Sequence, residues 1–324
     1  MNAPAGRGRV LSHVHPRFRE GDRSTVAPAV KLTEVSKTFD TFKAVDRVSF
    51  AIETGTIYGL LGPNGAGKTT TIRMILRIIL PDSGTVEVLG DSLRSRSKDR
   101  IGYLPEERGL YRKMKVIDLL TFFGEIKSMS RRSARRAATD WLDRLKLSDV
   151  AVKKVEELSK GMQQKVQFIA TVLHDPDLII LDEPFSGLDP VNVNVLMDII
   201  LEFNRKGHTV VFSTHMMEQV EKLCREICLI DKGRKVLEGK LADIKKQYGH
   251  NSVTIRFRGD GSFLKELPEV AGVNDYGNEL FLRLKDGADP TRVLMAAGSR
   301  LEIQKFEVAE PSIHDIFIEQ VSSG

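Results

Sequence analysis

The residues best suited to chemistry form a glycine-rich loop at residues 62–70, with the sequence GPNGAGKTT. It matches the pattern G-x-x-x-x-G-K-[ST], whose glycines let backbone N–H groups curl around phosphate oxygens. Lys68 can then reach the β- and γ-phosphates, and the Thr69 hydroxyl can bind Mg²⁺. A strand-like run precedes the loop and a helical pattern follows it, as this motif requires. The loop predicts a nucleoside-phosphate site formed by Gly62, Pro63, Asn64, Gly65, Ala66, Gly67, Lys68, Thr69 and Thr70.

A pair of carboxylates ends the apolar run at residues 178–183. Asp182 is placed to hold Mg²⁺, directly or through water. Glu183 follows one residue later, where its carboxylate can polarise an attacking water as a general base. The alternative is an ordinary acidic pair that caps a helix. The phosphate loop upstream favours the catalytic interpretation.

A second candidate anion site lies at residues 158–163, LSKGMQ, just before a helical pattern. Ser159 is a good N-cap and Gly161 allows close approach to the backbone, so the helix start can face an anion. Taken alone, the segment also fits an ordinary helix cap. Its position shortly before the Asp182–Glu183 pair makes it informative.

The elements that must position these residues alternate between strands and helices. Apolar runs without polar alternation are typical of strands buried on both faces of a parallel sheet, and helical patterns between them indicate an α/β domain. We expect strands at residues 30–35, 45–52, 56–61, 84–90, 178–182, 209–213 and 226–230, helices at 193–205 and 216–223, and a helical insert at 116–173.

After residue 249 the pattern changes to a small β-α-β-β-α-β unit, which predicts a ferredoxin-like arrangement. We expect strands at residues 252–257, 279–284 and 301–306, helices at 262–270 and 291–297, a turn at 276–278 and a closing helix at 311–321.

Composition limits the class of protein. The 324 residues are 41% hydrophobic and 29% charged, which is typical of globular chains. The net charge is +5, of which residues 1–29 carry +3, so only +2 is left for the remainder. This weakens a nucleic-acid interpretation, because such binding requires a concentrated basic face on a folded domain. We expect residues 1–29 to be a disordered basic tail, with a short membrane-surface or partner contact as the alternative.

Cysteine use and hydropathy indicate the compartment. Cys224 and Cys228 lie among apolar residues and outside any metal-type spacing, so we expect reduced core thiols in a cytosolic protein. No stretch of about 18 apolar residues is present. If the protein works at a membrane, another chain must span it.

With these motifs assembled, residues 31 to about 240 resemble the ATP-binding subunits of ABC transporters. Residues 62–70 resemble the Walker A loop, 158–163 the signature motif, 178–183 Walker B with its catalytic glutamate, and 186–189 the D-loop that ends in Asp189. His215 resembles the switch histidine, and Phe39 occupies the place of the aromatic that stacks on adenine. Phe42 is a rival for the stacking role, and core packing is the alternative for Phe39.

The resemblance implies a P-loop NTPase core of the ABC type, with an antiparallel β edge and a helical subdomain at about 105–172, spanning residues 30–240. A small α+β accessory domain would follow at 245–322. The implied ligands are ATP and Mg²⁺. Two such domains would pair head to tail, as a homodimer or a heterodimer, so that the signature motif completes the site in trans. The residues implied are Lys68, Glu183 and His215 for catalysis, Thr69, Asp182 and Glu106 for the metal, and Phe39, Ser159, Gly161, Gln163 and Asp189 for the nucleotide.

Two positions depart from the family pattern. Glu106 stands where the Q-loop glutamine is usual, and Lys160 stands where the signature usually has glycine. These departures and the C-terminal extension resemble the ABC-2-type exporters, including sodium-efflux and drug-resistance systems. That branch implies a separate transmembrane permease and a cytoplasmic place at the inner face of the cell membrane.

Two other functions remain open at this point. A soluble ABC protein that acts on nucleic acid or ribosomes would usually carry two cassettes or an insertion. The best basic cluster here, Arg131, Arg132, Arg135 and Arg136, has the spacing of a solvated helix face, so we expect no nucleic-acid partner. An importer subunit is the second alternative, because cargo and direction are set by the membrane chain.

Overall fold

The computed structural model describes residues 27–90, 95–107, 109–248, 252–285, 287–308 and 312–322. Residues 1–26 of the expected basic tail lie outside these ranges. The tail was expected to extend to residue 29, and this boundary is wrong. Ala29 is buried and its N–H donates to the Ile52 carbonyl at 2.8 Å, so the folded domain begins before Val30.

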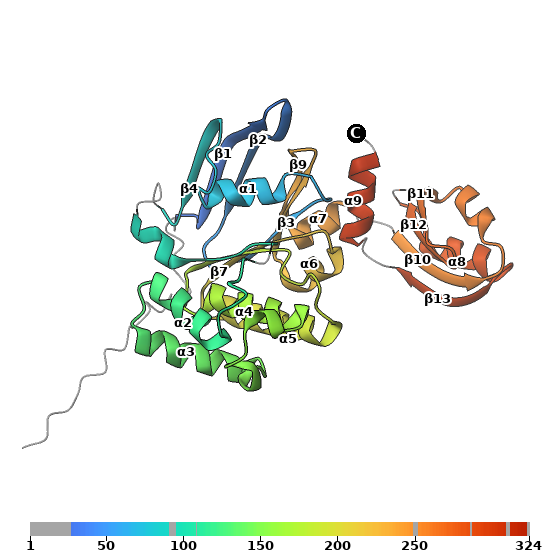
Figure 1. The fold of residues 1–324 in the computed structure, drawn as a ribbon. Coiled ribbons are helices and arrows are strands. Elements are labelled where there is room, and N and C mark those ends of the chain that lie inside the picture. The colour runs from blue at the N-terminus through green and yellow to red at the C-terminus, as the bar shows by residue number, and fades with distance from the viewer. Residues whose placement is uncertain are drawn as a thin grey trace, which may run out of the picture.

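A six-stranded sheet with the order β5-β6-β7-β3-β8-β9 forms the centre of the larger domain (Figure 1). The first five strands run parallel and β9 pairs antiparallel with β8. The bounds in this order are Ile101–Leu104, Leu178–Asp182, Thr209–Thr214, Ile57–Leu61, Glu226–Asp231 and Arg234–Lys240. Every residue of β3, β6 and β7 is buried, as their continuous apolar runs predict.

This strand order brings the chemical motifs together. β6, β7 and β3 are neighbours and parallel, so their carboxyl ends meet at one edge of the sheet. Ligands of open α/β sheets bind outside these ends. The phosphate loop follows β3, Glu183 follows β6, and His215 follows β7.

A three-stranded antiparallel sheet with the order β2-β1-β4 flanks the phosphate loop. Its strands are β1 (Val30–Phe39), β2 (Phe42–Ile52) and β4 (Ser83–Val88). Helix α1 (Lys68–Ile75) begins at the phosphate loop and buries Ile72, Met74 and Ile75 in a cluster shared with both sheets. The predicted antiparallel edge is therefore present.

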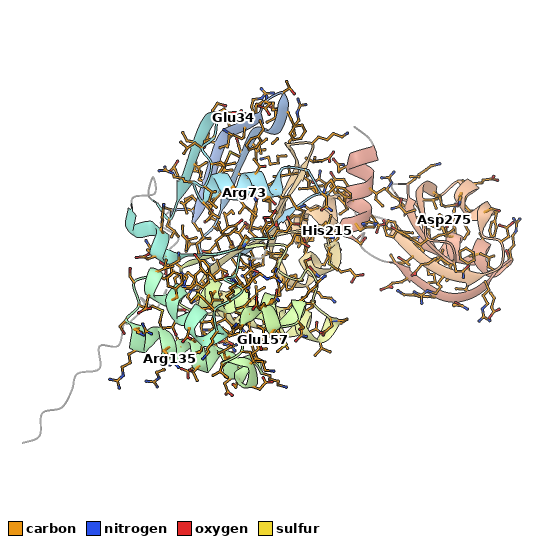
Figure 2. The ribbon with its side chains drawn as sticks, in the orientation of Figure 1. Glu34, Arg73, Arg135, Glu157, His215 and Asp275 are labelled. Atoms are coloured by element: carbon orange, nitrogen blue, oxygen red, sulfur yellow. The ribbon has the colours of Figure 1, made fainter. Side chains whose placement is uncertain are left out.

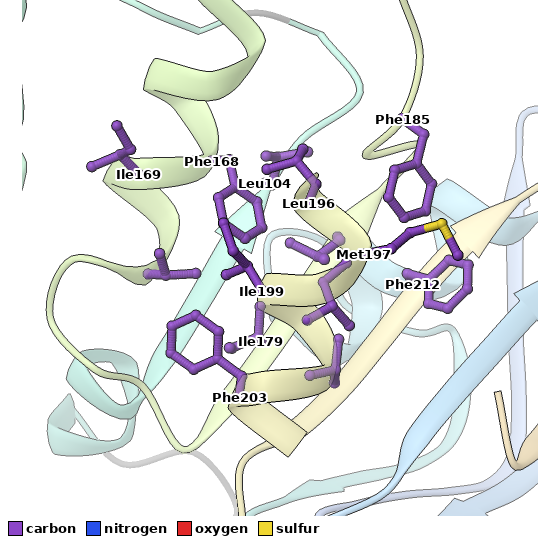
Figure 3. Packing of buried hydrophobic residues seen from close by; sticks show 14 of the residues in the cluster. Leu104, Phe168, Ile169, Ile179, Phe185, Leu196, Met197, Ile199, Phe203 and Phe212 are labelled. Atoms are coloured by element: carbon purple, nitrogen blue, oxygen red, sulfur yellow. The ribbon is translucent and has the colours of Figure 1, made fainter. Parts of the chain in front are cut away.

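Helices cover the sheet and build a projecting subdomain. α2 (Val116–Ile126), α3 (Arg131–Arg144) and α4 (Lys160–Val172) form the expected helical insert, and α5 (Pro190–Arg205) and α6 (Met217–Leu223) alternate with the strands. Figure 3 shows Phe168 of α4 and Leu196 and Phe203 of α5 packed around Ile179 of the sheet. Short 3₁₀ helices lie at Ser95–Arg100, Ser148–Val150 and Val155–Glu157.

The C-terminal domain is a four-stranded antiparallel sheet with the order β11-β12-β10-β13. Its elements are β10 (Ser252–Arg258), a 3₁₀ helix (Ser262–Glu266), β11 (Val270–Asp275), β12 (Glu279–Leu284), α8 (Pro290–Gly298) and β13 (Glu302–Val308). This is the strand order of the expected ferredoxin-like unit. The expected helix over 262–270 is wrong beyond Glu266, because the chain turns there into β11, a strand that we did not place from the sequence.

Two helices join the domains. α7 (Leu241–Tyr248) follows β9, and α9 (Ile313–Ser322) returns from the small domain. In Figure 1 α9 stands between the C-terminal sheet and the larger domain. Ile313 and Ile316 are buried in the core cluster of the larger domain, so the closing helix belongs to both units. Within the described ranges, no helix is long and apolar enough to span a membrane.

Candidate nucleotide site

The phosphate loop needs its glycines for steric reasons. Gly67 has φ 106°, and a Cβ there would lie 2.5 Å from the Ala44 carbonyl oxygen. Gly62 has φ 149°, and its Cβ would lie 2.1 Å from the Ile230 carbonyl oxygen. Since side-chain carbons do not approach backbone oxygen so closely, only glycine lets the loop fold tightly at the start of α1. The N–H groups of the first turn of α1 favour an anion there.

Lys68 lies inside the loop rather than in solvent. It is 6% exposed, and its Nζ donates to the carbonyl oxygens of Gly62 at 2.8 Å and Pro63 at 3.0 Å. Burial lowers the pKa of its ammonium, and the nearby carboxylates oppose this shift, in the order Glu183, Asp182 and Glu106. A buried ammonium whose hydrogen bonds go to two backbone carbonyls is suited to exchange them for phosphate oxygens.

An open hollow of ≈480 Å³ lies over the loop. Besides the loop and Lys68, its walls carry two aromatic rings and two carboxylates, from Phe39, Phe42, Glu106 and Glu183. Both rings are exposed, Phe39 by 44% and Phe42 by 63%, so the alternative of core packing for Phe39 is wrong. The two residues pair across the β1–β2 hairpin, and both are available to a flat base.

Glu183 is the centre of a hydrogen-bonded group. His215 Nδ1 lies 2.9 Å from Glu183 Oε1, and because a carboxylate only accepts, this nitrogen carries the proton. The Thr214 hydroxyl donates to Glu183 Oε2 at 3.4 Å, and Lys68 Nζ lies 3.9 Å from Oε1. The backbone N–H of Glu183 donates to the Ser213 carbonyl at 3.2 Å. The side chain is thus held at the hollow by groups from β7 and the phosphate loop.

Asp182 offers an oxygen without a partner. The residue is completely buried, and the Ser213 hydroxyl donates to its Oδ1. Its Oδ2 is buried and has no hydrogen-bond partner among the described residues. An unpaired buried carboxylate oxygen is costly unless a cation or water satisfies it. The Thr69 hydroxyl and the Glu106 carboxylate line the hollow, while Asp182 is not among its described lining residues. Hydroxyl and carboxylate oxygens are ligands that Mg²⁺ prefers, so the three residues fit this ion by the chemistry of their donors.

The signature residues lie elsewhere in this chain. Ser159 is the N-cap of α4, and its Oγ accepts the Met162 N–H at 3.3 Å, as predicted. The Gln163 amide donates to the Val155 and Leu158 carbonyls at 3.2 and 3.0 Å. Ser159, Gly161 and Gln163 are absent from the described walls of the hollow.

Asp189 also lies outside the hollow. It caps α5, and its Oδ1 accepts the Asn192 N–H at 3.0 Å. The chain therefore brings the phosphate loop, Phe39, Glu106, Glu183 and His215 together, and leaves the signature residues and Asp189 apart from them.

Three supporting residues were missed from the sequence. Gln167 of α4 donates to the Pro105 and Glu107 carbonyls at 3.1 and 3.3 Å, which ties the signature helix to the loop carrying Glu106. Gln219 Oε1 lies 3.5 Å from the Thr214 hydroxyl and is the alternative acceptor to Glu183 for its one proton. Burial, and then the Asp182 charge, raises the pKa of Tyr103 to about 12. Local patterns do not mark such residues, because their partners are distant in sequence.

The two cysteines stand as expected among apolar side chains. Both are buried and free. Burial raises the pKa of each thiol well above its usual range, so neither is a reactive thiolate.

Comparisons with known proteins agree with this geometry. Residues 45–186 match the ABC transporter family, and residues 239–321 match the C-terminal domain of DrrA1-3-like ATP-binding proteins. An uncharacterized ABC transporter ATP-binding protein, YhaQ of Bacillus subtilis, is 44% identical over 90% of this chain and 98% of its own length. The Nod factor export ATP-binding protein I of Sinorhizobium fredii is 34% identical over 91% of this chain and 87% of its own.

A solved structure of an ATP-binding protein is similar in fold to this chain. It is an ATP-binding cassette in a dimeric, post-hydrolysis state bound to ADP and Pi, with a TM-score of 0.61 and 25% identity over 65% of this chain and 98% of its own. The two sequence relatives match about nine tenths of this chain, and the structural relative matches 65% of it. The chain belongs to the family of ABC transporter ATP-binding proteins.

Proposed function

We propose that this chain binds and hydrolyses ATP to energise a membrane-embedded exporter. The observation that carries the proposal is the Glu183–His215 pair, held 2.9 Å apart at the edge of a hollow over the phosphate loop. A carboxylate held by a histidine and a lysine is suited to accept a proton from water. The export role of a relative that matches 91% of this chain supports the direction of transport.

The residues divide the work of hydrolysis. The loop N–H groups and Lys68 bind the phosphates. Glu183 takes a proton from water as the water oxygen attacks the γ-phosphorus, and the bond to the β-γ bridging oxygen breaks to give ADP and phosphate. His215 holds Glu183 in place through its Nδ1–H. Mg²⁺, when bound by Thr69, Asp182 and Glu106, supplies neutralising charge on the β- and γ-phosphates.

A second copy, or a similar chain, completes the site. Ser159 and Lys160 are exposed at the N-terminus of α4 and lie outside the hollow of their own chain. An N-terminus with unused donors favours an anion. We infer that it meets the γ-phosphate held by the opposite subunit in a head-to-tail dimer, with Asp189 at the contact. The dimeric relative supports this arrangement.

An aromatic patch beside the Glu106 loop is the proposed contact for the membrane subunit. Tyr111, Phe122 and Ile126 are exposed, and the Tyr111 and Phe122 rings meet edge to face at 5.8 Å. Neighbouring exposed apolar side chains indicate an interaction site. A contact through this patch would place the chain at the cytoplasmic face of the membrane.

A Phe122→Asp variant should no longer associate with native membranes, because a charge would lie in the apolar contact. Membrane association equal to that of the wild type would contradict this contact.

The proposal is tested by Glu183→Gln. The amide keeps the size of the side chain but cannot accept the proton, so kcat for Mg²⁺-dependent phosphate release should fall by about 10²–10⁴-fold. ATP binding should survive, and ATP should trap a dimer visible by size-exclusion chromatography. ATP hydrolysis by this variant at the wild-type rate would show that Glu183 is not the general base. A wild-type protein that does not hydrolyse ATP would contradict the proposed function.

A further inference from the structure

Helix α9 is packed on the ATPase domain although it comes from the far end of the C-terminal domain. It contacts α6, the helix that follows His215. Ile313 and Ile316 are 2% and 1% exposed and belong to the same buried cluster as Met217 and Val220 of α6. Burial of these two isoleucines removes apolar surface from water and so stabilises the docking of α9 on α6. The contact is therefore a packed interface.

A single carboxylate on α6 fixes the start of α9. Glu221 Oε1 accepts the Ile313 N–H at 2.6 Å, and Glu221 Oε2 accepts from Lys245 Nζ of α7 at 3.1 Å. The first N–H groups of a helix lack partners within the helix, so an external carboxylate stabilises that end. Glu221 is thus a cap for α9 supplied by the ATPase domain.

The same turn of α9 is bonded to the C-terminal sheet. Asp315 Oδ1 accepts from the Asn274 amide at 2.9 Å and from the Tyr276 hydroxyl at 2.7 Å, while its Oδ2 accepts the Ser312 N–H at 3.2 Å. Within three residues, α9 is therefore bonded to α6 on one side and to β11 and its following turn on the other. A displacement of the small domain would pull directly on α6.

α6 is in turn joined to the catalytic group. The Met216 N–H donates to the Thr214 hydroxyl at 3.0 Å, and that hydroxyl donates to Glu183. Figure 2 shows His215 on the side of the ATPase domain that faces the small domain. A cleft of ≈570 Å³ separates them, with His215 and Met216 on one wall and Tyr276 and Phe281 on the other. The cleft leaves room for His215 to move when the small domain moves.

We propose that the C-terminal domain sets the position of His215 through α9 and α6, and that Glu221 is a positioning residue for ATP hydrolysis. The inference rests on the proposed function, because it concerns regulation of the same site. Glu221 is not among the described residues that line the nucleotide hollow, and it bonds to Ile313 and Lys245, so we expect it to act on the rate of hydrolysis and not on ATP binding.

Three variants of the full-length chain test this. Glu221→Ala removes the α9 cap and the Lys245 ion pair, and should lower kcat by about tenfold with KM for ATP unchanged. Glu221→Gln retains an oxygen for the Ile313 N–H, so kcat should stay near the wild-type value. Lys245→Met removes only the ion pair and is the matched control. Hydrogen exchange should show faster exchange over α9 and residues 213–217 in Glu221→Ala alone.

A second disruption lies wholly in the small domain. The double variant Asn274→Leu, Tyr276→Phe cuts the bonds from the sheet to Asp315 and leaves Glu221 intact, so it too should lower kcat at constant KM, even if Glu221→Ala fails to fold. Wild-type kcat in both variants, with α9 shown by hydrogen exchange to be released, overturns the inference. A wild-type chain that does not hydrolyse ATP overturns the proposed function instead.

Discussion

The two halves of the nucleotide site are built differently in this chain. The phosphate-loop half uses the ends of three adjacent strands, and its side chains bond to one another, as Glu183 does to His215. The signature half is one helix start, whose exposed Ser159 bonds only within its own turn. The side chains of the phosphate-loop half are held in place by one another within this chain. The signature half lies exposed at the surface, where a second subunit can contact it.

The halves are nevertheless joined inside the chain. Gln167, two turns along α4 from Ser159, donates to the carbonyls on both sides of Glu106. Glu106 itself lines the hollow. A rotation of the helical subdomain would therefore move the signature helix and the Glu106 loop together. The signature half and the Glu106 side of the hollow are therefore coupled within one subunit, although they contribute to different nucleotide sites.

The largest effect is expected from mixing two inactive chains. Lys68→Ala disables the phosphate-loop half, and Gly161→Asp places a negative charge in the signature half. Each alone should hydrolyse ATP at background rates. A 1:1 mixture should recover about a quarter of the wild-type rate, because half of the dimers are mixed and each mixed dimer holds one intact site. The measurement is steady-state phosphate release.

The structure has room for a side chain at position 161, so we expect Gly161→Asp to change the signature half without disturbing the fold. A Cβ at Gly161 would meet its nearest described neighbour, Leu188 Cδ2, at 3.7 Å, which is ordinary contact. The variant should therefore fold, and its melting temperature checks this. If the mixture releases phosphate only at the background rate, the two halves do not complement each other between chains, which would contradict the head-to-tail dimer.

A smaller effect separates capping from trans contact. Ser159 and Ser130 both cap helices of the helical subdomain, α4 and α3. Replacing either with Ala should cost about 1 kcal/mol of stability. Only Ser159→Ala should also lower kcat, by about tenfold, since only Ser159 lies in the signature half. Equal activity of the two variants at equal stability would leave Ser159 with a purely structural role.

The features that could be predicted from the sequence are those that depend on residues close together in the chain. The phosphate loop, the buried strands and the cap at Ser159 depend on a few adjacent residues, and their patterns identified them. β11 was missed because its sequence, VAGVND, has a glycine and weak alternation, and its pairing with β12 creates the strand.

Residues that act through distant partners escaped prediction. Gln167 and Gln219 look like ordinary polar positions on helices, and only the folded chain brings them to the Glu106 loop and to Thr214. Likewise α9 was expected as a closing helix of the small domain, while Ile313 and Ile316 are buried against the larger one. The helical period shows that an apolar face exists, but the sequence does not say which surface covers it.

The smallest expected effect concerns the two rings at the edge of the phosphate-loop half. Lys37 Nζ lies 5.6 Å from the centre of the Phe39 ring, a cation–π distance that helps to hold this ring in place, and Phe42 is the more exposed of the two. Because loss of base stacking costs about 1–3 kcal/mol, Phe39→Ala should raise KM for ATP by about 5- to 150-fold at constant kcat. Phe42→Ala is the matched control and should change KM by less than about twofold. Inhibition by pyrophosphate, which has no base, should be equal in both variants. A larger KM change in Phe42→Ala would transfer the stacking role to Phe42 and leave the phosphate half of the site as described.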